Sequence, residues 1–319
     1  MGAHTRPARS CPSTLDFQAA FPRRGRLYHD PVSGALDFLA VGDVAEERPA
    51  DGLAILGGGA ARLAAHAAAL GLRTALVAKL GDDDEGRHLR DALERLKVDL
   101  HWVRTAPGLR TTVWHQPDGQ PQDRRVDRGA DLALRLDELP PISVTASLTV
   151  VCGYSLSVEP ARSAALGALT TARGRTGHSA LLLEADLLWW TNARMTRRVL
   201  EPAVARADSV AMTAADAHAL FGPVDGREAL RLTAEMGPRL VYLAQADGSV
   251  LLRDASRVYA CPSDAVPRDR YAGPAAFWAG LAQKSAPRKA ALDALRYASS
   301  VRRAGAPRPS QATAQSSRV

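Results

Sequence analysis

Cysteine is scarce in this 319-residue chain, and the three that it has, Cys11, Cys152 and Cys261, are widely separated. They fit neither a disulfide framework nor the ligand spacing of a zinc site, so we expect a reducing environment. No apolar run reaches the roughly 18 residues of a membrane span. The N-terminus lacks the apolar segment of a signal peptide. These absences predict a cytoplasmic protein that makes no contact with a membrane.

Aromatic residues are also few, at 5%, although hydrophobic residues make up 46% of the chain. Ala, Leu and Val provide most of this apolar content, which favours helices packed on a parallel sheet over a β-sandwich. The formal net charge is +7, and nearly all the cations are Arg. Such a charge is consistent with a general bias toward Arg or with an acidic ligand. Because no cationic run is interleaved with aromatic residues, we do not expect nucleic acid to bind.

Signatures of several enzyme classes are missing as well. The eight His residues show no H-E-x-x-H or other metal-binding spacing. The sequence contains no G-x-S-x-G elbow and no Walker loop. Zinc hydrolases, serine hydrolases of the nucleophile-elbow type and P-loop enzymes are therefore not predicted.

Apolar runs alternate with helical sequence between residues 36 and 307, and the flanking residues 1–35 and 308–319 are polar and aperiodic. We expect one domain between a poorly ordered N-terminal extension and a disordered tail. The expected strands are "DFLAVG", "TALVAKLG", "SLTVVCG", "SALLLE", "DSVAMT" and "RLVYLAQ". Strands that alternate with helices in this way predict a mostly parallel sheet covered on both faces.

Residues at the expected helix ends support this assignment. Gly71 is placed to terminate the first helix. Asp82 and Glu85, three positions apart, predict a capping box at the start of the next helix, with Asp82 as the cap. Pro287 is suited to the first turn of the last helix, which we expect to end at Gly305.

One region interrupts the alternation. Residues 98–130 contain a "PDGQ" turn between two runs that resemble hairpin strands. An antiparallel insertion of this kind is typical of a lid or of a dimer surface, although a merely decorative hairpin would give the same pattern. We expect a small β-lid there, which could also form a homodimer.

Two glycine-containing motifs lie about 200 residues apart. The first is "GGGAARLAAHAAALG" together with the downstream "KLGDDDEG", and the second is "DRYAGPAAFWAGL" at 269–281. Their order and spacing resemble the two signatures of the ribokinase-like (PfkB) carbohydrate kinase family. In the first signature the small residues match, and Arg62 replaces the Asn of the family. The matching positions are Gly57, Gly58, Ala60, Ala64, Gly71 and Gly81.

The resemblance covers nearly the whole chain between its two tails. It implies a ribokinase-like three-layer α/β fold with a β-lid, a sugar or sugar acid as substrate, and ATP with Mg²⁺ as cofactors. The implied substrate-binding residues are Glu47, Gly58, Gly59, Arg62 and Arg128. The implied nucleotide-binding residues are Asp247, Gly248, Ala272 and Gly273, and the implied metal ligand is Asp216.

The second signature departs from the family at its catalytic end. Its first Asp is present as Asp269, but the last Asp, which is the catalytic base of the family, is replaced by Ala275. Ala cannot accept a proton, and Pro274 has no N–H to donate to a phosphoryl group. Asp269 and Asp264 are the nearest acids that could substitute for the base.

Other family positions have also changed. The D-x-N-x-R motif of the family corresponds here to Glu184, Asp186 and Leu188, and its N-x-x-E motif corresponds to Thr213 and Asp216. Gln245 occupies a usual glycine position. The segment around Arg128 resembles the 2-keto-3-deoxygluconate kinase branch.

Two interpretations follow. The first is a catalytically impaired homologue that keeps a cleft for a sugar or sugar acid, or that binds a partner. The second is an active ATP-dependent carbohydrate kinase with a non-standard base, for which a 2-keto-3-deoxygluconate-like substrate is one candidate. If Arg62 points into the cleft, its charge favours an anionic ligand. Whether the protein is an enzyme is not decided by the sequence.

Overall fold

The computed structural model describes residues 35–50, 54–116, 124–174, 177–185, 190, 192–263 and 265–301. The polar tail and all but the last residue of the N-terminal extension lie outside these ranges. So do Asp264, Asp186 and Leu188. Within the described ranges, no helix has the length and apolar character needed to cross a membrane.

A nine-stranded sheet forms the centre of the described part of the chain, in the order β13-β12-β11-β10-β9-β8-β1-β4-β5. In this order, the strands from β11 across to β5 all run parallel to one another, and β12 and β13 form an antiparallel hairpin at the other edge. The bounds are β1 Leu36–Val41, β4 Thr74–Gly81, β5 Val103–Ala106, β8 Ala146–Cys152, β9 His178–Leu182, β10 Ser209–Thr213, β11 Leu240–Ala244, β12 Val250–Asp254 and β13 Arg257–Cys261. The predicted mostly parallel sheet is confirmed.

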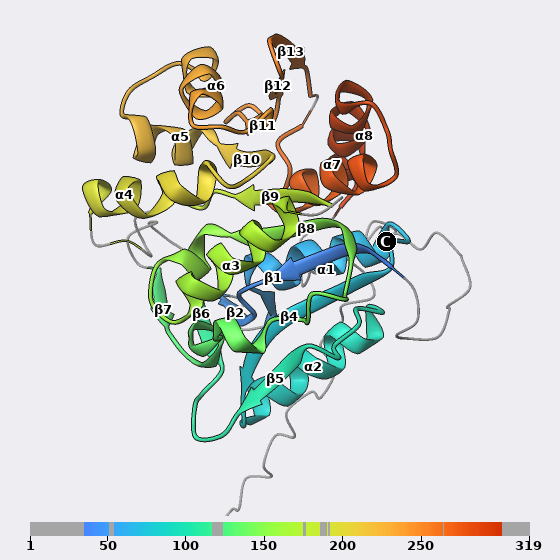
Figure 1. Ribbon diagram of the computed structural model, residues 1–319, viewed down its shortest axis with the longest axis vertical. Coiled ribbons are helices and arrows are strands. Elements are labelled where there is room, and N and C mark those ends of the chain that lie inside the picture. Colours follow the sequence, from blue (N-terminus) through green and yellow to red (C-terminus); the bar gives the residue numbers. More distant parts are fainter. Residues whose placement is uncertain are drawn as a thin grey trace, which may run out of the picture.

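Helices cover both faces of this sheet, and the alternation of side chains along each strand explains how (Figure 1). Phe38 and Ala40 of β1 pack into one apolar cluster, whereas Leu39 and Val41 pack into the other. The first cluster includes side chains of α1 (Gly59–Ala69), α2 (Asp84–Arg95), α7 (Ala272–Ala282) and α8 (Pro287–Ser300). The second includes side chains of α3 (Ala161–Arg173), α4 (Ala193–Val204), α5 (Ala214–Phe221) and α6 (Gly226–Glu235). The result is a three-layer α/β/α domain.

A second, small sheet has the strand order β3-β2-β6-β7. Its strands are β2 (Ala45–Pro49), β3 (Ile55–Gly57), β6 (Thr112–Gln116) and β7 (Arg125–Asp127). The β-lid expected over 98–130 differs from the observed small sheet in two respects. Strand β5 pairs in parallel with β4 of the central sheet, and β2 and β3 supply half of the small sheet.

The physical reason is that two strands alone bury too little apolar surface to be stable. The pair formed by β6 and β7 therefore adds to β2, which follows β1 almost directly. The "PDGQ" turn expected between β6 and β7 lies outside the described residues.

The helix ends confirm two of the four expected local signals. Gly71 follows α1 with φ of +87°, a backbone conformation that favours glycine. Pro287 is the first residue of α8, which ends at Ser300 rather than at Gly305. The cap of α2 is Asp83, not Asp82, because the Asp83 carboxylate accepts from the N–H of Gly86. Asp83 also accepts hydrogen bonds from Thr111, so a contact distant in sequence selects the cap.

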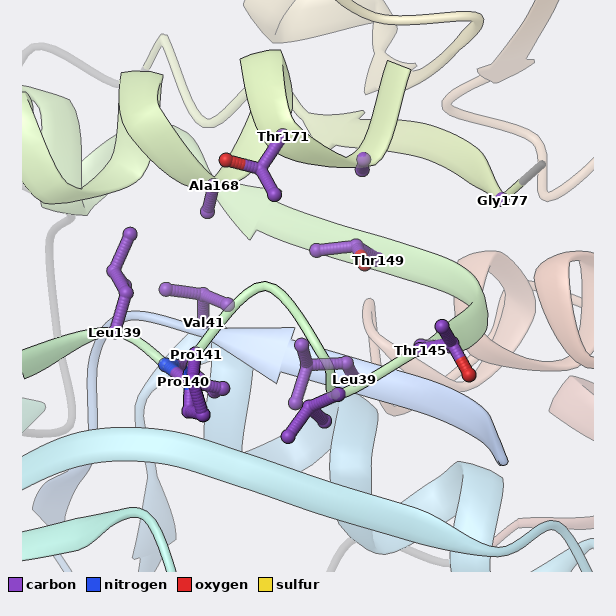
Figure 2. Close-up of a pocket in the computed structure, with 13 residues that line it drawn as sticks. Leu39, Val41, Leu139, Pro140, Pro141, Thr145, Thr149, Ala168, Thr171 and Gly177 are labelled. Carbon is purple, nitrogen blue, oxygen red and sulfur yellow. The ribbon is translucent and has the colours of Figure 1, made fainter. Parts of the chain in front are cut away.

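A pocket of about 70 Å³ lies between α3, β1 and the loop that leads into β8 (Figure 2). Leu39 and Val41 form its floor, and Pro140, Pro141 and Thr145 line the loop side. The pocket borders the start of β8 rather than its end.

Candidate functional site

Buried polar side chains gather where the central parallel strands end. Asp43 follows β1, Cys152 ends β8, Glu184 follows β9, and Tyr271 immediately precedes α7. Parallel strands end at the same edge of the sheet, where α/β proteins bind their ligands. All four of these side chains are buried.

The N-terminus of α1 binds the carboxylate of Asp43. The N–H of Gly59 donates to Asp43 Oδ2 at 2.5 Å, and the N–H of Ala60 donates to Oδ1 at 3.2 Å. Gly58, with φ of +86°, allows this close approach, because an added Cβ would lie 2.7 Å from the backbone oxygen of Asp43. The first helical N–H groups, which often hold a ligand anion, are thus satisfied by the chain itself.

Glu184 is held between two donors. Its Oε2 accepts from the N–H of Tyr154 at 3.2 Å, and its Oε1 accepts from the hydroxyl of Tyr271 at 3.1 Å. Burial, together with the neighbouring charge of Asp43, raises the pKa of Glu184 to about 8. Burial likewise raises the pKa of Asp43, even though its two backbone hydrogen bonds oppose the shift.

Arg62 joins the small sheet to the start of α7. Its guanidinium donates to Glu47 Oε2 at 3.1 Å and to Asp269 Oδ2 at 2.5 Å. His66, one turn further along α1, contacts the same Asp269 oxygen through Nε2 at 2.8 Å, and its Nδ1 lies 2.9 Å from the hydroxyl of Tyr297. Arg62 is only 7% exposed.

These pairs determine the charge of the network. Burial by itself would raise the pKa of Asp269, but Arg62 and His66 hold that pKa well below its usual range. The expectation that Arg62 favours an anionic ligand loses its basis here, because two carboxylates already neutralise the guanidinium. The side chain points neither outward nor into free space.

The first turn of α7 is enclosed. Ala272, Gly273, Pro274 and Ala275 are all buried, and a Cβ added at Gly273 would lie 2.7 Å from the hydroxyl of Tyr242. The methyl group of Ala275 belongs to the apolar core beneath the sheet edge. The position of the expected catalytic base therefore carries no polar group.

Tyr271 packs over this turn. Its hydroxyl bonds Glu184, and the guanidinium of Arg62 lies 5.2 Å from the centre of its ring. Arg270 contacts the same ring at 5.4 Å. The side chain of Tyr271 thus occupies the space between α1, α7 and the loop after β9.

The sequence profile of pfkB family carbohydrate kinases matches residues 43–305. This chain belongs to that family. A fructokinase from Klebsiella pneumoniae is 30% identical over 201 residues, which cover 61% of this chain and 64% of the relative. The alignment thus spans less than two thirds of that relative.

Solved structures agree in fold with this pfkB-family chain. Aminoimidazole riboside kinase from Salmonella enterica, solved with aminoimidazole riboside and an ATP analogue, superposes with a TM-score of 0.75 at 20% identity. That match covers 82% of this chain and 91% of the kinase. A fructokinase from Halothermothrix orenii gives the same TM-score at 22% identity, covering 82% and 98% of the two chains. The predicted ribokinase-like fold is confirmed.

Several residues expected at the site lie elsewhere or have structural partners. In this pfkB-family chain, Asp216 completes the capping box of α5, whose cap is Thr213. It accepts three hydrogen bonds, from Ala185 N–H at 2.8 Å and from the N–H and hydroxyl of Thr213 at 2.8 and 2.7 Å. Asp216 thus joins the start of α5 to the loop after β9, and the magnesium site expected there stays a prediction.

Asp247 and Gly248 form the turn between β11 and β12. Asp247 Oδ1 accepts from the N–H and the hydroxyl of Ser249, at 2.9 and 2.6 Å. Gly248 has φ of +87°, and the segment at 265–266 packs directly against it. Gln245 bonds the same serine through Nε2. The hydrogen bonds of this turn are therefore local, and within the described ranges none joins it to Tyr271 or Glu184.

Arg128 lies at the junction of the small sheet and the central sheet. Its guanidinium is 5.9 Å from the centre of the Tyr154 ring. Nearby, Asp131 is buried, and its Oδ2 has no hydrogen-bond partner within the described ranges. Burial raises the pKa of Asp131 well above its usual value.

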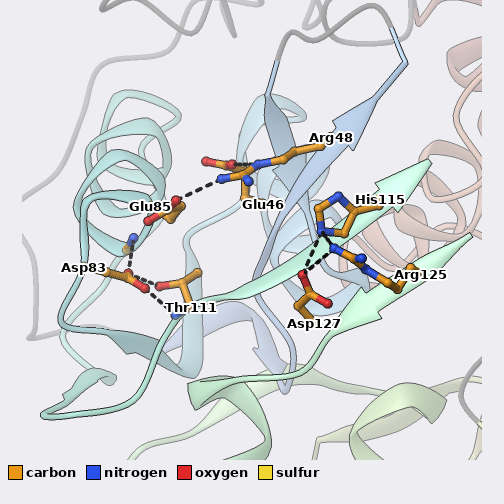
Figure 3. Close-up of polar contacts among 9 residues, drawn as sticks. Glu46, Arg48, Asp83, Glu85, Thr111, His115, Arg125 and Asp127 are labelled. Carbon is orange, nitrogen blue, oxygen red and sulfur yellow. Dashed lines mark hydrogen bonds and ion pairs between the residues drawn. The ribbon is translucent and has the colours of Figure 1, made fainter. Parts of the chain in front are cut away.

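One ion pair, made by Arg48, joins the small sheet to α2 (Figure 3). Arg48 of β2 bonds Glu46 at 2.6 Å and reaches Glu85 of α2 at 2.9 Å. On the neighbouring strands, His115 and Asp127 pair at 2.9 Å. Glu46, the neighbour of Glu47 in β2, is therefore engaged by Arg48.

Sequence reasoning missed Asp43, Cys152, His66 and Tyr271 as members of this cluster. Asp43 could have been found, because an acid directly after a buried first strand lies at the ligand-binding edge of a parallel sheet. The other three carry no local signal. Their roles depend on which strand ends become neighbours.

Proposed function

We propose that this protein is a pfkB-family homologue in which phosphoryl transfer is impaired, and in which the fold serves to bind a sugar or a protein partner. One observation carries the proposal. The position of the family's base is Ala275, fully buried in the apolar core. Transfer to a sugar requires removal of a proton from the attacking hydroxyl, and an alanine methyl cannot accept it.

The surroundings of this position support the same conclusion. Pro274 removes one N–H from the helix start that would stabilise a transferring phosphoryl group. Asp269, the nearest described acid in the motif, is a poor base, because Arg62 and His66 hold its pKa low. Tyr271 and the Arg62 ion pairs also occupy the region in which a ligand is expected. A sugar would have to displace Tyr271 or bind outside it.

The enclosed charges favour a neutral sugar over a sugar acid. Glu47 and Asp269 already neutralise Arg62 on both sides. An incoming carboxylate would face those two acids. Repulsion between like charges in a desolvated site opposes such binding.

An active carbohydrate kinase is the second candidate, and one observation favours it. Glu184 has a pKa near 8, which lies in the range suited to a general base at neutral pH. In that case Glu184, rather than Asp269 or Asp264, would take the proton from the substrate. The two candidates make opposite predictions for turnover.

The test is ATP-dependent phosphorylation of a sugar panel that includes fructose, using the purified full chain. We expect turnover at background for the wild type, because loss of a general base costs about 10²–10⁴-fold. Ala275→Asp and Ala275→Asp with Pro274→Gly are measured beside it. Turnover of about 1 s⁻¹ or more, abolished by Glu184→Gln, would establish the second candidate. Thermal-shift measurements with the same sugars test binding, and a panel without any shift would leave only the partner-binding role.

A further inference from the structure

Three potential metal ligands converge behind the first turn of α1. An oxygen of Asp43, the sulfur of Cys152 and an oxygen of Glu184 all lie within 4.8 Å of one another. All three residues are fully buried. They come from the ends of three adjacent parallel strands, β1, β8 and β9, so the sheet itself fixes their separation.

Cys152 distinguishes this group from an ordinary cluster of acids. Within the part of the chain that the structure describes, its thiol makes no hydrogen bond, although it is fully buried. The sulfur points at the same space as Glu184. A methyl group added at Gly59 would lie 3.0 Å from Cys152 Sγ and 2.9 Å from Glu184 Oε1. Glycine at position 59 therefore keeps the sulfur and the carboxylate facing each other.

Two carboxyls and a thiol lie together in this group, and their negatively charged forms need a counter-charge. The buried cation Arg62 is committed to Glu47 and Asp269. The attraction that Asp43 and Glu184 feel comes from Arg270, whose side chain is exposed. Buried acids are compensated by protons, by a partner or by a metal ion.

We propose that Asp43, Cys152 and Glu184 bind a divalent transition-metal ion of borderline softness, with Zn²⁺ as the representative. A donor set of one sulfur and two carboxylates suits Zn²⁺ or Co²⁺ better than Mg²⁺ or Ca²⁺, which prefer oxygen alone. Bound ions of this kind have ligand distances of about 2.0–2.3 Å. Separations within 4.8 Å among the three ligand atoms are compatible with one ion bound by all three.

Binding exchanges protons for the ion. The S–H bond of Cys152 breaks and its proton leaves to solvent, while the sulfur lone pair forms the bond to the metal. Glu184, protonated in part at neutral pH, loses its proton in the same way. No electron is transferred. Affinity therefore depends on deprotonation of the ligands, as it does for other thiolate sites.

The site shares Glu184 with the second candidate function, but its test is separate, because a cobalt–thiolate band depends on Cys152 and not on turnover. A structural ion here would hold together the ends of β1, β8 and β9. It would also fix Asp43 at the start of α1. The expected effect of the metal is thus greater stability of the folded chain.

The experiment is a titration of the chelator-treated full chain with Co²⁺. Bound thiolate gives a sulfur-to-cobalt charge-transfer absorption in the near ultraviolet, which His or carboxylate sites lack. We expect this band together with a rise in melting temperature for the wild type. Both should persist in Cys261→Ser, a matched control at another buried cysteine, and in Cys11→Ser.

Cys152→Ala should abolish the band. It should also weaken Zn²⁺ competition by at least about 10–100-fold, the loss typical even of residues that only support a ligand. Glu184→Gln should weaken the band without removing it. Circular dichroism and an unfolding curve establish that each variant is folded. The proposal fails if the folded wild type shows no band, or if the band survives in Cys152→Ala.

Discussion

Arg62 and Asp269, 207 positions apart in the chain, form a buried ion pair in which Nη2 and Oδ2 are 2.5 Å apart. Arg62 stands where the family signature has Asn, and Asp269 is the acid that the second signature retains. The two signatures are thus connected through a charge that the substitution introduced. Glu47 completes the pairing from the small sheet.

Replacement of Arg62 by Met should be strongly destabilising. It would leave Asp269 and Glu47 buried without their cation, and breaking a buried pair in this way costs about 3–5 kcal/mol. Urea unfolding followed by circular dichroism measures the change. Arg231→Met is the matched control, because Arg231 pairs only with acids on the exposed surface of α6. Equal losses for the two variants would contradict the role of the Arg62 pair.

Stability should decrease between about pH 5 and pH 8 because of Glu184. Its pKa is raised to about 8 in the folded chain, from 4.5. A raised folded-state pKa means that the native state binds the proton more tightly than the unfolded state does. The resulting stabilisation is fully present below the unfolded pKa and is lost as the pH rises through about 8.

Glu184→Gln removes this titration while keeping an oxygen that can accept from Tyr154. Its unfolding midpoint should therefore vary less between pH 5 and pH 8 than that of the wild type. Urea midpoints at one-unit intervals measure the two slopes. If the slopes are the same, another group governs the pH dependence in this range.

The cap of α2 can be tested by comparing two adjacent acids. Asp83→Ala removes the acceptor for Gly86 and for both donors of Thr111, so a loss of about 1–2 kcal/mol is expected. Asp82→Ala should change the stability little, because Asp82 is exposed and does not cap the helix. A larger loss for Asp82→Ala would reverse the assignment.

Binding of MgATP should be weak. Pro274 lacks an N–H, the start of α7 is buried, and Thr213 stands where the family has Asn. Isothermal titration calorimetry with the wild type and with Pro274→Gly measures this directly. We expect no saturable heat in the low micromolar range and little gain from the substitution. Micromolar affinity in the wild type would show that nucleotide binds by another route.

The sequence by itself determined the parallel α/β domain. Apolar periodicity located the strands, and the glycine spacing of two motifs identified the family. The sequence also determined which chemical groups are absent. In any fold, Ala275 has no side-chain proton acceptor and Pro274 has no N–H. Helix ends that depend on residues close together in the sequence were also predictable, such as Gly71 after α1 and Pro287 at the start of α8.

Only the tertiary structure decided which distant residues meet. Strand order and loop paths decide three such contacts. They are the pairing of β5 with β4, the hydrogen bond from Thr111 that favours Asp83 as the helix cap, and the ion pair of Arg62 with Asp269. The same holds for Asp43, Cys152 and Glu184, which are neighbours because β1, β8 and β9 are adjacent in the sheet. Local patterns encode the periodicity of an element, whereas such contacts depend on how the whole chain buries its apolar faces.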